Sequence, residues 1–227
     1  MWDFKIDEYR KKAILEDFLV DILYGKYGTK LIMHGGTCIW RCYKGNRFSR
    51  DIDLYYDLGA EKFRDFSRAL LDYLKEKGLA IKESGYFDTI NTFSVITQGD
   101  TKVKLDINFS SAPGSAEADY ETTGGNKKLI IALPPEMLMN EKIDAYTDKL
   151  KKHKDEIQDL YDIWILRQSV TGASAKTLRR VGVLLDTIKD NKPGNSRSLE
   201  ALMLGGITPS FEKMIKDLKE WEDAGNK

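Results

Sequence analysis

The sequence has no net charge, no long apolar run and very little cysteine, and each of these absences excludes a class of protein. Its 227 residues carry 36 basic and 36 acidic side chains. Overall charge therefore does not indicate a nucleic-acid-binding protein, although a local basic patch would still fit this balance. No apolar run is long enough to span a bilayer. Length and apolar content indicate a globular protein with a substantial core.

The few cysteines and the polar N-terminus bear on the compartment. The first residues, MWDFKIDEYRKK, lack the apolar segment of a signal peptide. Cys38 and Cys42 are four residues apart and form no disulfide framework. Together with His34 they could be imagined as metal ligands, but a fourth ligand is missing. We therefore expect a cytoplasmic protein without a membrane segment.

The first 133 residues mix helical and strand patterns. Apolar side chains recur at helical spacing over residues 6–24, ended by Gly25 and Gly28, and over residues 63–74, closed by Gly78. The stretch 114–126 is rich in glycine, serine, glutamate and threonine and predicts a loop. Short apolar or alternating runs predict strands at residues 31–33, 51–56, 91–97, 102–109 and 129–133.

The sequence from Pro134 onward has the pattern of helices separated by short loops. We expect helices at residues 136–152, 155–169, 174–189, 196–204 and 209–223. The predicted fold class is thus α+β. It comprises an α/β domain over residues 1–133 and an all-helical domain over residues 134–227.

Two aspartates in the second predicted strand point to metal chemistry. Asp51 and Asp53 are two residues apart, so their side chains project from one face of a strand. Two such close carboxylates repel each other unless a cation lies between them, and their hard oxygen atoms suit Mg²⁺. Asp106 lies on the polar face of a later strand. If that strand pairs beside the first, three carboxylates could hold two metal ions for an in-line phosphoryl displacement.

The residues before these aspartates are suited to phosphate. A strand runs into Gly35, Gly36 and Thr37 and then into a helix, which leaves free backbone N–H groups at a helix N-terminus. The Thr37 hydroxyl could add a donor. Arg47 and Ser49 follow and could bind phosphate oxygens. We therefore predict a phosphate cradle, a basic loop and metal-binding carboxylates in one site.

These motifs resemble a known family. The pattern GGT-x₃-R followed by RFS-x-DID is similar to the DNA polymerase β-like nucleotidyltransferases, and more closely to the AbiEii/AbiGii toxin branch, which includes the MenT-type toxins. The third carboxylate of that family best matches Asp106. A helical motif of the family appears here as EKIDA at residues 141–145 and QDLYDI at residues 158–163. From it, the resemblance implies that Lys142 and Asp159 contact the nucleotide. The match covers roughly residues 30 to 166.

The resemblance implies a mixed sheet with helices on one side and a helical domain closing one wall of a cleft. It also implies transfer of a nucleoside monophosphate from a nucleoside triphosphate to a hydroxyl, in a toxin–antitoxin or abortive-infection system. Asp51 and Asp53 would hold Mg²⁺ or Mn²⁺, and Asp106 would hold the second ion and help to deprotonate the acceptor. The acceptor would be an RNA, such as tRNA, or a protein, and a cognate antitoxin would be a partner.

Other interpretations stay open at this stage. His34 and Gln158 stand where the family often has lysine and arginine. Charges such as Lys142 and Asp159 could simply form a solvated helix face, and the lysines of residues 149–154 could contact RNA or keep the surface soluble. Two other functions also remain. One is transfer to a small molecule, as in antibiotic nucleotidyltransferases. The other is a non-catalytic nucleotide- or partner-binding module on the same fold.

Overall fold

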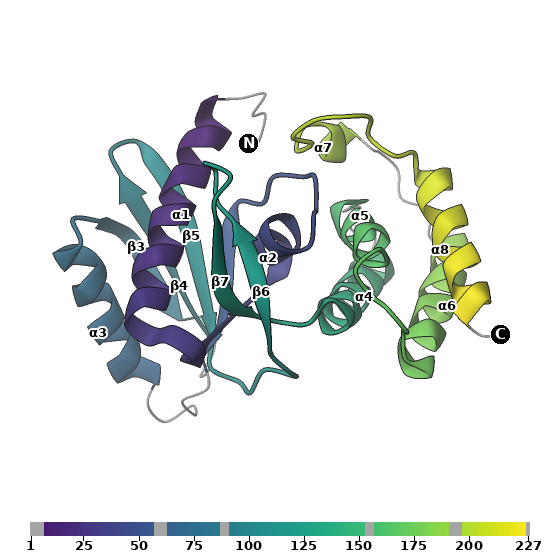
Figure 1. Cartoon of the computed structure of the whole chain (residues 1–227), viewed down its shortest axis with the longest axis horizontal. Coiled ribbons are helices and arrows are strands. Elements are labelled where there is room, and N and C mark those ends of the chain that lie inside the picture. Colours follow the sequence, from purple (N-terminus) through teal and green to yellow (C-terminus); the bar gives the residue numbers. More distant parts are fainter. Residues whose placement is uncertain (1–6, 57–62, 87–90, 153–156, 191–196, 226–227) are drawn as a thin grey trace. The chain divides into compact units, whose positions relative to one another are not determined.

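The computed structural model describes residues 7–56, 63–86, 91–152, 157–190 and 197–225. The chain forms two compact units (Figure 1). The first consists of Met1–Cys42 and Phe48–Leu133, and the second of Tyr43–Arg47 and Pro134–Lys227. In the part of the chain described here, no helix combines the length and apolar character needed to cross a membrane.

A seven-stranded mixed sheet organises the first unit, in the order β3-β4-β5-β2-β1-β7-β6 (Figure 1). The elements in chain order are α1 (Asp7–Tyr27), the 3₁₀ turn η1 (Gly28–Lys30), β1 (Leu31–His34), α2 (Gly35–Cys42), β2 (Asp51–Tyr56), α3 (Phe63–Glu76), β3 (Ala80–Tyr86), β4 (Asn91–Gln98), β5 (Thr101–Asn108), β6 (Ala116–Glu121) and β7 (Lys127–Ala132). Strand β2 is antiparallel to β1 and parallel to β5, and β1 is parallel to β7. The expected mixed α/β fold is confirmed.

The central strands alternate as the sequence predicts. Ile52 and Leu54 of β2 are buried, while Asp51 and Asp53 lie on the opposite, partly exposed face. The buried face lies under helices: the ring of Tyr56 in β2 stacks on Phe66 of α3 with centroids 4.0 Å apart. Helix α1 meets the same rings, and α2 packs beside α1. The carboxylates therefore occupy the face that the apolar core leaves free.

Two strands and one helix end differ from the sequence-based expectation. Strand β6, AEADYE, lies inside the stretch that composition predicted as a loop, and β3 was not expected either. Both are edge strands with acidic residues, and pairing with β7 and β4 overrides their weak strand propensity. Helix α1 also continues through Gly25 to Tyr27. The break comes instead at Gly28, whose φ of +55° ends the helix.

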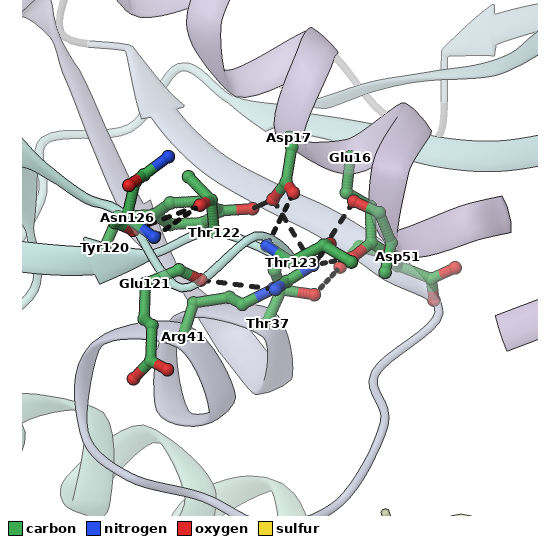
Figure 2. Close-up of polar contacts among 11 residues, drawn as sticks. Glu16, Asp17, Thr37, Arg41, Asp51, Tyr120, Glu121, Thr122, Thr123 and Asn126 are labelled. Carbon is green, nitrogen blue, oxygen red and sulfur yellow. Dashed lines mark hydrogen bonds and ion pairs between the residues drawn. The ribbon is translucent and has the colours of Figure 1, made fainter. Parts of the chain in front are cut away.

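A buried arginine ties α1, α2 and the β6–β7 turn together (Figure 2). The Arg41 guanidinium donates to the carbonyl oxygens of Glu121, at 3.2 Å, and Ala13, at 3.3 Å. The same group lies 3.4 Å from Asp17 Oδ1 and 3.6 Å from Glu16 Oε2. Burial raises the pKa of Glu16 from its ordinary value of 4.5 to about 8, against the opposing charge of Arg41. A charged network thus lies inside the first unit.

The second unit is helical. Its elements are α4 (Pro135–Lys151), α5 (Ile157–Leu166), α6 (Ala175–Asp190), α7 (Arg197–Glu200) and α8 (Phe211–Gly225). The predicted start of a helix at residue 155 lies outside the described residues. Helix α7 is shorter than expected, because the residues after it turn back: the Leu204 N–H donates to the Asn46 carbonyl oxygen at 3.1 Å. This contact brings the Tyr43–Arg47 segment into the helical unit.

Candidate active site

The glycine turn is shaped by the aspartate beside it. Strand β1 ends at His34, whose register partner in β2 is Asp53, and α2 begins at Gly35. Gly35 has a φ of +71°, and a Cβ at this residue would lie 2.0 Å from Asp53 Oδ2. Only glycine accommodates both the left-handed backbone and this close approach. The Asp53 carboxylate consequently sits at the N-terminus of α2, where the helix dipole favours negative charge.

The second part of the turn supports a strand. The Thr37 hydroxyl donates a hydrogen bond to the carbonyl oxygen of Asp51 at 2.6 Å, and Thr37 is fully buried. A hydroxyl has a single hydrogen to donate. In the structure this hydrogen bond fixes the start of β2. Phosphate binding by Gly35, Gly36 and Thr37 stays a prediction.

Strand pairing brings the third carboxylate to the first two. Strands β2 and β5 are parallel neighbours, and their register aligns Asp53 with Asp106 and Asp51 with Lys104. The pairing that the sequence left conditional is therefore present. Three carboxylates and one lysine lie on adjacent strands at one face of the sheet.

Lys104 supplies a positive charge beside the three carboxylates. Its ammonium nitrogen lies 2.6 Å from Asp106 Oδ2. Burial opposes the charge of Lys104, but the hydrogen bond to Asp106 and the charges of Asp106, Asp51 and Asp53 outweigh it and raise its pKa. The pKa of Asp51 is also raised, first by burial and then by Asp53. The sequence signal for Lys104 was its position two residues before Asp106 on the same strand face.

The carboxylate face has the oxygen ligands that a divalent cation prefers, but its side chains are not arranged as a complete metal site. Within the described ranges, no three carboxylate, imidazole or thiol side chains are placed to hold a metal ion together. Lys104 donates to Asp106 Oδ2, and metal binding by Asp51, Asp53 and Asp106 stays a prediction. The other oxygen, Asp106 Oδ1, is buried and has no hydrogen-bond partner among the described residues. Such an orphaned carboxylate oxygen among two further aspartates fits a hard cation.

Arg47 pairs with a carboxylate of the helical unit. It belongs to the helical unit, is buried, and donates from Nε to Asp162 Oδ1 at 2.6 Å, with a second N–H directed at Oδ2. Both oxygens of one carboxylate therefore hold the Arg47 guanidinium, which fixes its direction. Phosphate binding by Arg47 stays a prediction. Ser49 is also buried and stays a predicted phosphate contact.

Lys142 and Asp159 belong to the same buried network. The Lys142 ammonium lies 2.9 Å from both Asp159 Oδ1 and Asp162 Oδ2, and Lys149 lies 2.6 Å from Asp159 Oδ2. Burial raises the pKa of Asp159, but the charge of Lys142 and the hydrogen bonds of both lysines lower it overall. The charges of Asp162 and Asp159 likewise outweigh burial and raise the pKa of Lys142. These charges do not form a solvated helix face.

The predicted site residues thus fall into two groups. Gly35, Gly36 and the three aspartates lie in the sheet unit, and Arg47, Lys142 and Asp159 lie in the helical unit. Asp162, which pairs with Arg47 and Lys142, was not among the predicted site residues. Its spacing of three residues from Asp159 was the available signal, because it places both carboxylates on one helix face.

Comparisons with known proteins agree with this architecture. Residues 17–222 match the family model described as nucleotidyl transferase AbiEii toxin, type IV TA system. The structure of JHP933 from Helicobacter pylori superposes with a TM-score of 0.63 and 16% identity, covering 95% of this chain and 92% of that one. A candidate nucleotidyltransferase from H. pylori gives a TM-score of 0.61 and 16% identity, with 95% and 94% covered. No curated protein matches the sequence.

The two structural matches show a shared fold, and the family match extends from α1 into α8, well beyond the motifs themselves. The glycine turn and the carboxylate strands lie inside the matched residues. This chain therefore belongs to the AbiEii nucleotidyltransferase toxin family.

Proposed function

We propose that the chain uses Mg²⁺, with Mn²⁺ as the alternative, to transfer a nucleoside monophosphate from a nucleoside triphosphate to an RNA 3′ hydroxyl, such as that of a tRNA. One observation carries the proposal. Asp53 and Asp106 are register partners beside the Gly35 turn, and Asp106 keeps a buried oxygen that no donor in the described part of the chain reaches. A hard divalent cation requires such an oxygen-rich face, and the cation in turn binds the phosphates of a triphosphate.

The chemistry follows from charge. A divalent cation on the aspartates would supply neutralisation of the phosphate oxygens and of the departing pyrophosphate. The acceptor oxygen attacks the α-phosphorus, and a new P–O bond forms while the bond to the pyrophosphate oxygen breaks. We assign the acceptor proton to Asp106 Oδ1. Asp51 and Asp53 would hold this cation. Most of the rate enhancement would come from positioning and electrostatics.

The remaining candidates have more limited roles. Gly35 and Gly36 offer backbone N–H groups at the start of α2 to the phosphates. Lys142 keeps 17% of its side chain exposed and stays the candidate for a triphosphate contact, with Asp159 fixing its ammonium. Asp162 holds the Arg47 guanidinium, whose contact with phosphate stays a prediction.

The family connection also bears on a protein partner. The family description names a type IV toxin–antitoxin system. We propose that a cognate antitoxin counteracts this enzyme. Growth on induction, with and without a co-expressed candidate antitoxin, tests this part separately from the chemistry.

A labelling screen tests the transfer. Purified protein, Mg²⁺ and each common nucleoside triphosphate labelled at the α-phosphate are incubated with total RNA, with a protein lysate, and alone. Asp53→Asn is the inactive variant. Asp119→Asn is the matched control, because Asp119 forms an exposed ion pair with Lys127 on the β6–β7 hairpin, away from the carboxylate strands.

The molecule that becomes labelled distinguishes transfer to RNA from transfer to a protein or to a small molecule. Label on RNA from the wild type and Asp119→Asn, but not from Asp53→Asn, supports the proposal. Label on protein or on a small molecule keeps the enzyme and changes the acceptor. A wild type that binds nucleotide but labels nothing would indicate a non-catalytic binding module.

A further inference from the structure

The chain passes through the helical unit just before it enters β2. Helix α2 ends at Cys42, residues Tyr43–Arg47 belong to the helical unit, and Phe48 is back in the sheet unit. We call residues 43–47 the anchor loop. Asp51 is only four residues beyond Arg47. The position of the anchor loop therefore bears directly on the first aspartate of the candidate active site.

The helical unit holds the anchor loop by its backbone and by its side chains. The Asn46 N–H donates to the Tyr161 hydroxyl at 3.0 Å, and the Asn46 side-chain amide donates to the Gly205 carbonyl at 2.6 Å. Arg47 forms an isolated antiparallel bridge with Met203. Three separate attachments thus act on two adjacent residues.

Asp162 makes the charged attachment. This carboxylate is fully buried and accepts from two nitrogens of the Arg47 guanidinium, Nε and one terminal nitrogen. Lys142 lies 2.9 Å from its Oδ2, so Asp162 is shared between α4 and the anchor loop. Bidentate pairing fixes the direction of a guanidinium as well as its distance, and a buried carboxylate needs such partners.

The sheet unit fixes the next residue. Phe48 is fully buried, stacks on Tyr9 with centroids 4.4 Å apart, and meets Trp40 edge-on at 5.1 Å. Arg47 is therefore held in one unit and Phe48 in the other, and only two residues, Ser49 and Arg50, separate Phe48 from Asp51. Thr37 then holds the Asp51 carbonyl.

We propose that Asp162 is a positioning residue, which fixes Arg47 and the anchor loop and so sets the start of β2 and the placement of Asp51. The inference rests on the proposed function only for its consequence in catalysis. It assigns Arg47 to the same task and separates it from the phosphate ligands. A phosphate-binding Arg47 would instead gain freedom when Asp162 is removed.

Hydrogen–deuterium exchange on the full chain tests the inference without any activity. Asp162→Asn and Arg47→Gln are compared with the wild type and with Asp217→Asn. Asp217 is the matched control, because it pairs with Arg167 at 2.9 Å and accepts from Trp164 in the same unit, on α8 rather than beside the anchor loop. Thermal unfolding establishes that each variant folds. If Asp162→Asn fails to fold, Arg47→Lys takes its place, since a lysine cannot reproduce the two-pronged pair.

We expect the rate of amide exchange over residues 43–52 to rise at least about tenfold in each of the two single variants. The double variant should show the same increase, because all three variants break the one pair between Arg47 and Asp162. Asp217→Asn should leave this segment unchanged. Unchanged exchange over residues 43–52 in folded Asp162→Asn and Arg47→Gln would overturn the inference.

Kinetics supply a readout that a merely structural role would not move. Positioning predicts that Arg47→Gln, which leaves the contact between Lys142 and Asp162 in place, lowers kcat by about tenfold or more while KM for the nucleoside triphosphate changes little. A phosphate ligand predicts a raised KM in Arg47→Gln but not in Asp162→Asn, which would contradict the inference. If the wild type transfers nothing, the proposed function fails, and the exchange result still decides whether Asp162 positions the loop.

Discussion

Gly35 and Asp53 are so close that a methyl group on residue 35 would lie 2.0 Å from the Asp53 carboxylate oxygen. The contact joins the glycine turn to the carboxylate strand. The two parts of the sequence motif, separated by seventeen residues, therefore meet as one structural feature.

Replacing Gly35 with alanine should damage both folding and the site. The left-handed backbone alone costs about 1–2 kcal/mol for a residue with a Cβ, and Asp53 must also move. We expect the melting temperature to fall by at least about 4 °C and nucleotidyl transfer to be lost. Gly25→Ala is the control, because Gly25 lies within helix α1 and an added Cβ there would have none of the described atoms within 4 Å. A Gly35→Ala protein as stable and active as Gly25→Ala would refute the role of this contact.

Replacing Lys104 with methionine should make the carboxylate face depend on added metal. Lys104 is the ammonium beside Asp106, so its loss leaves three carboxylates without their nearest cation. Without metal, the variant should melt below the wild type. Mg²⁺ should raise its melting temperature more than that of the wild type, because the cation no longer competes with a lysine. Lys102→Met, on the same strand but exposed, should respond to Mg²⁺ as the wild type does. An equal response in Lys104→Met would show that Lys104 does not occupy the cation position.

The buried Glu16 predicts a pH dependence of stability. Its pKa is raised from 4.5 to about 8 in the folded chain, so the folded state binds a proton more tightly than the unfolded state. Stability should therefore fall as pH rises between these values. Arg41, Asp17 and Asp51 are the charged groups that act on Glu16.

In Glu16→Gln this pH dependence should be absent. The variant should gain melting temperature relative to the wild type as pH rises from about 5 to about 8. Glu117→Gln serves as the comparison, because Glu117 is exposed on the edge strand β6. A melting temperature that differs from the wild type by the same amount at every pH would mean that Glu16 stays charged in the folded protein.

Asp159 predicts the opposite dependence. Its pKa is lowered in the folded chain by Lys142 and Lys149, so it contributes stability at neutral pH that is lost as pH falls through its folded pKa. Asp159→Asn should be markedly less stable than the wild type near neutrality, and the difference should shrink under acid. Asp144→Asn breaks a more exposed ion pair with Arg180 and should change stability little. Urea unfolding at several pH values distinguishes the two.

Local sequence patterns were enough to predict the central strands of the sheet and the faces on which their side chains lie. The alternation in β5 and the Asp-Ile-Asp spacing in β2 fix which side chains face the core, because neighbouring side chains of a strand point to opposite faces. Strands β3 and β6 were missed because their composition is poor for strands and only pairing with β4 and β7 makes them extended. A single sequence does not report that pairing.

The same limit applies to the site. Asp51, Asp53 and the glycine turn are close in sequence, and their shared chemistry could be predicted. The pairing of Arg47 with Asp162 joins residues 115 positions apart, and no local pattern indicates it. A threonine after a glycine turn predicts a hydroxyl that can donate to phosphate. No local pattern indicates the hydrogen bond that this hydroxyl donates to the Asp51 carbonyl oxygen.

The most direct test of the account is the turnover of Asp53→Asn and Asp106→Asn beside the wild type, at increasing Mg²⁺ and with the RNA acceptor that the labelling screen identifies. Label on the acceptor and released pyrophosphate are measured together. We predict equal amounts of both from the wild type and none from either variant, with all three proteins folded. Transfer by either variant at the wild-type rate would contradict the claim that the carboxylate face of β2 and β5 is the active site.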